Sequence, residues 1–370
     1  MQKNNNTEQN NQPQKKVNNK GKRFLFSVLR IVITVLIVFP ILFFIKLPYM
    51  YHSPGSCEDT SNFIKIKGVK KFNTHGRFFL TTVIYERANI FLFLYGKVNP
   101  EAELTYKKDK SKKHDKQRNN YMVQQMADSK LKAKIAAFRT LGYEVKMKKG
   151  PVRVMNIKSW SRAKGILKVG DAIIEAQGKP VKNEEQLIEI VKNTSADKPV
   201  QLTVLRNEGK GKNAKEKEMK VNVPLIEIDG VPKIGIQILA KIESADLPFD
   251  VTIESSNIVG ASAGMMFSLE IMKRVSGVDL TGGYRIAGTG AVDEDGNVMS
   301  IKGVKYKVMI SEKTGCRYFL CPEKNFEDAK KAAKNIKVLP VKNLKDALAH
   351  LEKINPSANL EKFIKKDQPD

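Results

Sequence analysis

The stretch Gly260–Gly277, GASAGMMFSLEIMKRVSG, decides the fold of the C-terminal part of this chain. Small residues surround Ser262, at Gly260, Ala261, Ala263 and Gly264. Apolar residues then recur at helical spacing, at Met265, Met266, Leu269, Met272 and Val275. We therefore expect a tight turn that places Ser262 at the start of a helix, where unpaired backbone N–H groups can stabilise a developing oxyanion. The same residues are also typical of a serine N-cap and of closely packed helices.

A serine hydroxyl needs a base before it attacks a carbonyl carbon, and histidine is the usual base. The chain has four histidines, His52, His75, His114 and His350, and none of them forms a plausible Ser/His/Asp set. A lysine can take this role when burial lowers its pKa, because desolvation disfavours the ammonium form.

Four segments beyond Ser262 follow the pattern of a known peptidase domain: Leu280–Gly283 (LTGG), Ile286–Gly290 (IAGTG), Asp295–Val298 (DGNV) and Ile301–Val308 (IKGVKYKV). Together with the serine turn they resemble the Lon-type (S16) peptidase domain, from Val231 to Leu351. The resemblance implies that Ser262 is the nucleophile, that Lys307 is the base, and that Thr289 hydrogen-bonds and orients this lysine. It implies no metal or organic cofactor.

The chain departs from this family pattern close to the site. Ala261 replaces the usual proline before the serine, Val259 stands where many members have an acid, and Lys302 replaces the first glycine of a GG pair. Lys305 is a second candidate for the base, but Lys307 matches the family position that has an orienting partner.

Further towards the N-terminus, Leu167–Val181 (LKVGDAIIEAQGKPV) predicts a strand and a glycine-supported turn before a helix capped by Asn183. This pattern resembles the centre of a PDZ domain that extends from Tyr143 to Pro224. The resemblance implies a groove to which an extended peptide adds as a strand. The implied groove residues are Gly150, Pro151, Val152, Arg153 and Val154 on the loop and strand edge, and Leu187 and Val191 on the helix Glu184–Val191. The alternative is an unrelated small α/β module.

Other segments predict individual elements of the exported part. Phe78–Tyr85 and Ile90–Tyr95 are β-branched and aromatic, as strands are. The apolar spacing of Met122–Leu141 predicts a helix. Cys316 and Cys321 flank a predicted strand, so we expect them to face opposite ways and to pack in a core.

The segment Phe24–Ile45 is apolar except for Ser27, Arg30 and Thr34, and as a helix it is long enough to cross a membrane. The preceding tail has six basic residues, Lys3, Lys15, Lys16, Lys20, Lys22 and Arg23, against one acid, Glu8. This charge predicts a cytoplasmic N-terminus and an extracytoplasmic remainder. The alternative is a cleaved signal peptide, but the apolar run is too long for one and no A-x-A-like site follows.

The chain has 370 residues and 65 Lys and Arg against 39 Asp and Glu, a formal charge of +26. The densest basic runs, Lys107–Arg118 and Arg206–Lys220, have no interleaved aromatic residues for base stacking. We therefore expect solvated loops and no nucleic-acid partner, with membrane lipid or another anionic surface nearby. Three cysteines, Cys57, Cys316 and Cys321, rule out a disulfide-rich scaffold and a structural zinc site. No GxxxxGK[ST] phosphate loop occurs, so ATP is not expected either.

These inferences predict an α+β multidomain protein with an N-terminal transmembrane helix, a PDZ-like β-rich domain and a Lon-type proteolytic α/β domain. The predicted parts are a cytoplasmic disordered tail (1–23), the transmembrane helix (24–46), a strand-rich region with a basic loop (47–120), a helix plus PDZ domain (121–228), the peptidase domain (229–353) and a C-terminal tail (354–370).

This combination resembles the bacterial YlbL/SepM family of membrane-anchored surface serine peptidases. The resemblance implies an ATP-independent Ser-Lys endopeptidase that cleaves exported peptides or membrane-protein segments, with the PDZ domain binding or gating the substrate. The alternative is an inactive membrane-anchored scaffold that binds extracytoplasmic peptides. A second enzymatic alternative comes from the penicillin-binding pattern SxxK, SxN and KTG at Ser161, Ser255 and Lys313. The first of these falls inside the PDZ-like region, and too few residues follow it for that fold.

Overall fold

The computed structural model describes residues 19–69, 74–107, 112–208, 215–255 and 258–358. Residues 1–18 of the predicted tail and residues 359–370 lie outside this part. The chain divides into two compact units, one made of residues 1–52 and 85–109, the other of residues 53–84 and 110–370. Strands β1 (Lys46–Asp59) and β3 (Arg77–Asn89) have residues in both units.

The first unit contains the long helix α1 (Asn19–Phe44). Its portion Phe24–Phe44 has the length and apolar composition needed to cross a membrane. Helix α2 (Ile90–Val98) and strand β4 (Glu103–Tyr106), which pairs antiparallel with the start of β1, complete this unit. The predicted strand Ile90–Tyr95 is wrong, because the Asn89 side chain accepts a hydrogen bond from the Leu92 amide at 2.8 Å and starts a helix.

The second unit contains a sheet with the strand order β18-β17-β14-β3-β1. The strands that join β1 and β3 are β14 (Arg285–Gly288), β17 (Tyr318–Pro322) and β18 (Lys337–Val341). β14 pairs parallel with both β3 and β17, and β17 pairs parallel with β18. This sheet therefore includes parts of β1 and β3 that lie far before the predicted boundary at residue 229.

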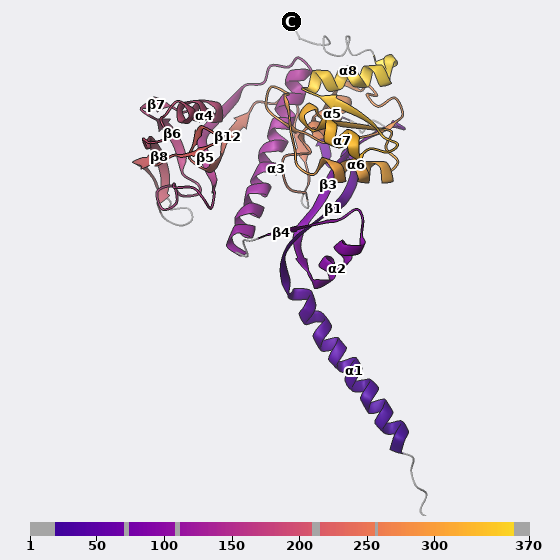
Figure 1. Ribbon diagram of the computed structural model, residues 1–370. Helices are drawn as coiled ribbons and strands as arrows, with labels where there is room; N and C mark the ends of the chain where they lie inside the picture. Colours follow the sequence, from indigo (N-terminus) through magenta and orange to yellow (C-terminus); the bar gives the residue numbers. More distant parts are fainter. Residues whose placement is uncertain (1–18, 70–73, 108–111, 209–214, 256–257, 359–370) are drawn as a thin grey trace, which may run out of the picture. The chain divides into compact units, whose positions relative to one another are not determined.

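Helices cover both faces of this sheet, and side chains alternate between the two cores. Phe78 and Leu80 of β3 belong to the core formed with α3 (Lys112–Thr140), α5 (Gly264–Ser276) and α8 (Leu344–Ile354). Phe79, between them, belongs to the opposite core with α6 (Val304–Lys313) and α7 (Phe326–Ala332). Figure 1 shows β3 and β1 running side by side into this α/β/α layer.

Two predictions on this unit need correction. Helix α3 begins at Lys112, so the second half of the basic run Lys107–Arg118 is helical, whereas residues 108–111 lie outside the described part. Cys316 precedes strand β17 and belongs, with Cys321, to one core. Their predicted core packing is confirmed, but their predicted opposite orientation is wrong.

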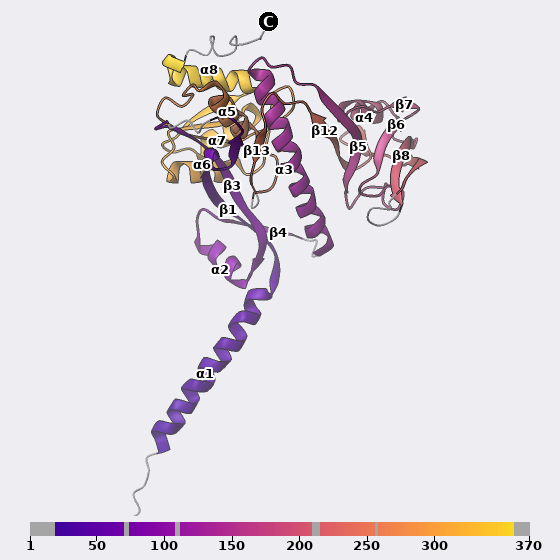
Figure 2. The same ribbon diagram turned by 180° about the vertical axis from the view of Figure 1, so that it is seen from behind.

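A second sheet in this unit has the order β12-β5-β6-β8-β9. Its strands are β5 (Met147–Ile157), β6 (Ala172–Ala176), β8 (Val200–Glu208), β9 (Lys215–Val223) and β12 (Ile236–Ala245), and β7 (Lys179–Pro180) pairs with β6. Helix α4 (Glu184–Lys192) packs Leu187 and Val191 into its core. Figure 2 shows β5 and β12 side by side.

A buried ion pair braces this second sheet. Asp171 accepts two hydrogen bonds from the Arg206 guanidinium, at 2.8 Å from Nε and 2.7 Å from Nη2. The remaining short pairs in the unit are β10 (Ile226–Ile228) with β11 (Val231–Lys233), β2 (Ile64–Ile66) with β13 (Val251–Ile253), and β15 (Ala291–Val292) with β16 (Val298–Met299).

Candidate active site

Ser262 lies in the turn that leads into α5, two residues before the helix begins at Gly264. Gly260 opens this turn with φ of +92°, a left-handed conformation that glycine adopts without strain. Helix α5 is buried from Gly264 to Arg274, so the turn is anchored to a core helix. Ser262 itself is half-buried, which leaves its hydroxyl within reach of a substrate.

Lys307 lies in the first turns of α6 and is only 4% exposed. Its Nζ is 3.0 Å from Ser262 Oγ and donates a hydrogen bond to the Thr81 main-chain oxygen at 2.6 Å. Burial lowers the pKa of Lys307 from its ordinary value to about 7. A lysine in this state is neutral in a large fraction of molecules at neutral pH, so it can accept the serine proton.

Thr289 lies next to the dyad, but it contacts the nucleophile and not the base. Its Oγ1 donates to the Ser262 main-chain oxygen at 3.1 Å, and the Gly290 amide donates to the same oxygen at 2.8 Å. The predicted hydrogen bond from Thr289 to Lys307 is therefore wrong. The acceptor that orients Lys307 is the carbonyl of Thr81 on strand β3.

The small residues around Ser262 differ in what their amides do. The Gly260 amide donates to Met122 O at 2.9 Å, and the Gly264 amide donates to Ala261 O at 3.2 Å. Among the described residues, no acceptor faces the amides of Ser262 and Ala263. Of the predicted oxyanion residues, Ala261 and Ala263 have amides with no acceptor among the described residues, as does Ser262 itself, whereas the amides of Gly260 and Gly264 are used within the turn.

Helix α3 supports the same turn from outside. Ser129 is buried, and its Oγ donates to the Ala261 main-chain oxygen at 3.0 Å. Met122 lies on the same helix, and its main-chain oxygen accepts the hydrogen bond from the Gly260 amide. Sequence reasoning missed both Ser129 and Thr81, because one is a serine within an ordinary helical pattern and the other acts through its backbone.

Two lysines near Lys307 in the sequence, Lys302 and Lys305, do not reach the Ser262–Lys307 pair. Lys302 and Lys305 are exposed, and Lys305 Nζ lies 4.8 Å from the centroid of the Tyr306 ring. The position of Lys305 therefore gives no support to its role as an alternative base. Within the described ranges, no group of three His, Cys, Asp or Glu side chains has the arrangement of a metal site.

The predicted peptide groove is misplaced by one strand. β5 lies between β12 and β6, and Val152 pairs with a residue on each side, so it has no free sheet edge. Gly150 and Pro151 lie at a bulge in the pairing of β5 with β12. Val154, like Val152, is fully buried in the core with Leu187 and Val191, and Arg153 pairs with Glu216 at 3.2 Å. The two edge strands of the sheet are β12 and β9, and β12 is the one that contacts α4.

The edge of β12 next to α4 already holds one side chain of the protein. The Ala240 amide donates to Glu184 Oε1 at 2.7 Å, and Glu184 is the first residue of α4. An outward amide on an edge strand is the group that pairs with an added strand. The β12 edge facing α4 is thus the position where a peptide can add, provided that it displaces Glu184.

Comparison with known protein families gives one match over part of each of the two large sheets. Residues 140–223 match the PDZ domain family, and residues 253–353 match the C-terminal proteolytic domain of the Lon protease (S16) family. The chain contains a PDZ domain and a Lon-type proteolytic domain. The matches leave out Thr81 on β3 and Ser129 on α3, although both contact the dyad or its turn.

Among curated proteins, the chain is similar to the Lon protease of Rickettsia bellii (strain RML369-C), with 33% identity over 95 residues. The match covers 25% of this chain and only 12% of that protease. Among solved structures, the PDZ domains of SdrC-like proteins from Listeria monocytogenes and Listeria innocua are similar. They have 23% and 26% identity, cover 25% and 24% of this chain and 93% of each domain, and have TM-scores of 0.21 and 0.20.

Proposed function

We propose that this protein is an ATP-independent, membrane-anchored serine endopeptidase that uses a Ser262–Lys307 dyad. The observation that carries the proposal is the 3.0 Å approach of a buried lysine amine to Ser262 Oγ. A buried lysine without a carboxylate partner destabilises a protein, so its retention beside a serine hydroxyl favours a chemical role. The lowered pKa of Lys307, about 7, supports the same conclusion.

The proposed reaction starts with neutral Lys307. One N–H group of Lys307 donates a hydrogen bond to the Thr81 carbonyl. The nitrogen lone pair is therefore free to face Ser262 Oγ and take its proton. Ser262 Oγ then attacks the peptide carbonyl carbon, and the amides of Ser262 and Ala263 stabilise the tetrahedral oxyanion. The lysine proton passes to the leaving amine nitrogen, and an acyl-enzyme ester remains on Ser262. Water, deprotonated by Lys307, hydrolyses this ester and restores the serine.

The substrate class follows from the domain set and the N-terminal helix. The apolar helix Phe24–Phe44 supports membrane anchoring, and the basic tail before it supports a cytoplasmic N-terminus. The peptidase and PDZ domains would then face the outside and act on exported peptides or membrane-protein segments. We propose that such a segment adds to the β12 edge of the PDZ domain.

The test compares the peptides that cells release when they carry the wild-type chain or its Ser262→Ala variant. Peptides present only with the wild type are the expected result, together with loss of Ser262 labelling by a fluorophosphonate probe. Equal release from both strains, with equal amounts of folded protein, would overturn the peptidase. That result would favour the inactive peptide-binding scaffold.

A further inference from the structure

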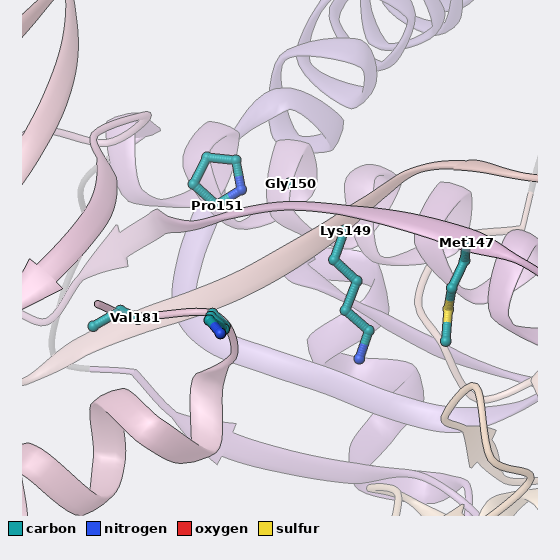
Figure 3. A pocket seen from close by; sticks show the side chains of 6 residues that line it. Met147, Lys149, Gly150, Pro151 and Val181 are labelled. Atoms are coloured by element: carbon teal, nitrogen blue, oxygen red, sulfur yellow. The ribbon is translucent and has the colours of Figure 1, made fainter. Parts of the chain in front are cut away.

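A cavity of about 480 Å³ lies in the PDZ domain between β5 and the segment that leads into α4. It is lined by Met147, Lys149, Gly150, Pro151, Val181 and Lys182. Figure 3 shows that the side chains of Lys149 and Met147 extend from β5 on the same side, into the space beside Val181. Its size lies within the range of pockets that hold small ligands or peptide side chains.

The lining of this cavity is cationic. Lys149 and Lys182 are both exposed, and no acid is among the lining residues. Lys149 Nζ is already bound by a carboxylate, that of Glu294. Within the described residues, Lys182 has no carboxylate partner. The protein itself thus places one carboxylate, that of Glu294, against Lys149. A carboxylate from a bound ligand would find a second cation, Lys182, at the same cavity.

The cavity is close to the β12 edge. Lys149 lies opposite Ile242 of β12 in the sheet, and Lys182 precedes Glu184 by two residues. Glu184 in turn binds the Ala240 amide on that edge. A peptide that adds to β12 at Ala240 therefore comes level with Lys149 about two residues further along, with β12 between the peptide and β5, and a long side chain must cross this one strand to reach the cavity.

The charged side chains of the protein determine where along that peptide an acidic residue is favourable. An acidic side chain beside Ala240 would face Glu184, and like charges at this distance repel. An acidic side chain that reaches the cavity would face Lys149 and Lys182 instead. The protein, with a formal charge of +26, also attracts acidic peptides over a longer range.

We propose that this cavity is a specificity pocket for one acidic side chain of a peptide added to β12, and that this side chain competes with Glu294 for Lys149. The inference rests on the proposed peptide-binding role of the β12 edge. It adds the chemical class of the ligand, an extended segment with an Asp or Glu at a fixed distance from the residue that pairs with Ala240.

Fluorescence anisotropy with dye-labelled peptides tests the pocket. The protein is the full-length chain in detergent micelles, with Ser262→Ala to prevent cleavage. One eight-residue peptide of valine and threonine serves as the neutral reference, and a single glutamate or glutamine is moved along it. We expect glutamate to bind about three- to tenfold tighter than glutamine at one position only, the range for two partly exposed ion pairs.

Variants of the chain separate the pocket from general charge. Lys182→Gln and Lys149→Gln should each remove most of the glutamate preference, whereas Lys179→Gln should keep it, because Lys179 is an exposed β7 lysine that does not line the cavity. Glu294→Gln should strengthen binding of the acidic peptide alone, since it removes the competitor. This gain has the opposite sign to any loss from misfolding.

Two results would overturn the inference in distinguishable ways. If the neutral peptide binds but glutamate gives no advantage at any position, or the advantage survives both pocket variants, the acidic pocket is wrong and the β12 edge stands. If neither the neutral nor the acidic peptides bind, the proposed β12 edge is wrong and the pocket with it.

Discussion

Lys307 is 4% exposed and contacts Ser262 within a core, whereas Lys149 and Lys182 of the PDZ domain are exposed to solvent beside an edge strand. The same side chain therefore serves two different ends in one chain. Burial lowers the pKa of Lys307 to about 7, so this side chain can exchange a proton near neutral pH. General-base chemistry on a peptide bond requires a buried lysine held in one position, whereas recognition of a carboxylate is suited to a solvent-exposed lysine.

The largest expected effect breaks the buried side of this comparison. Lys307→Met should lower kcat for a model peptide by about 1,000-fold or more, because among the described residues Lys307 is the base that contacts Ser262 Oγ. Lys305→Met is the matched control, and its kcat should stay within about twofold, the change expected for an exposed residue away from the site. Thermal unfolding should show both variants folded, since methionine suits a buried position. A kcat of Lys307→Met within tenfold of the wild type would contradict the dyad.

The second prediction concerns pH and again separates the two kinds of lysine. Lys307 acts as a base only when it is neutral, so kcat/KM should rise with pH, tenfold per unit, and level off above a pH of about 7. From the plateau above this pKa down to pH 5 the loss should be about 100-fold. Binding of the neutral peptide to β12, measured by anisotropy over the same range, should show no such step. A pH-independent kcat/KM between pH 5 and 8 would be incompatible with a lysine base of this pKa.

A smaller effect is expected from the support of the nucleophile turn. Ser129→Ala removes the hydrogen bond to Ala261 O, and we expect about a tenfold lower kcat with little change in KM. Ser268→Ala is the matched control, because Ser268 is also buried and donates to Ala133 O and, within α5, to Gly264 O, but not to Ala261 O. Similar losses of stability with a kcat loss only in Ser129→Ala would support positioning. Equal kcat losses in both variants would point to general destabilisation.

The smallest effect concerns the exposed side. Ala240→Pro removes one outward amide of β12, and edge strands tolerate proline where the N–H faces away from the sheet. Affinity for the neutral peptide should fall about fivefold, the value of one hydrogen bond. The rate of fluorophosphonate labelling at Ser262 should not change. Unchanged peptide affinity would show that strand addition does not use Ala240.

The two sites also differ in how far they could be predicted from the sequence. Ser262 and Lys307 were predicted because a serine flanked by small residues and a lysine at a matching position are side-chain patterns. The groove was placed on β5 by the resemblance to a PDZ domain, but a sheet edge depends on which strands pair. β12 comes about 80 residues later in the chain, and no local pattern reveals that it covers β5.

The elements of the fold likewise differ in how well the sequence predicts them. Helix α4 was predicted at Glu184, where its N-cap signal stands, and its observed bounds agree. The run Ile90–Tyr95 was mistaken for a strand, since a single Asn89 cap outweighs the β-branched and aromatic composition. Thr81 could not be predicted at all, because any residue supplies a main-chain carbonyl.

The hydrogen bond from Lys307 to Thr81 O bears on which parts of the chain must be transferred together for the Ser262–Lys307 pair to keep its geometry. A recombination event that moved only residues 253–353, the Lon match, would carry the nucleophile and the base but leave behind the strand that aims the base. It would also leave behind the helix that carries Ser129. The smallest transferable gene segment for this chemistry therefore starts before the PDZ sequence, and the PDZ domain travels with it as an insert between parts of a single catalytic body.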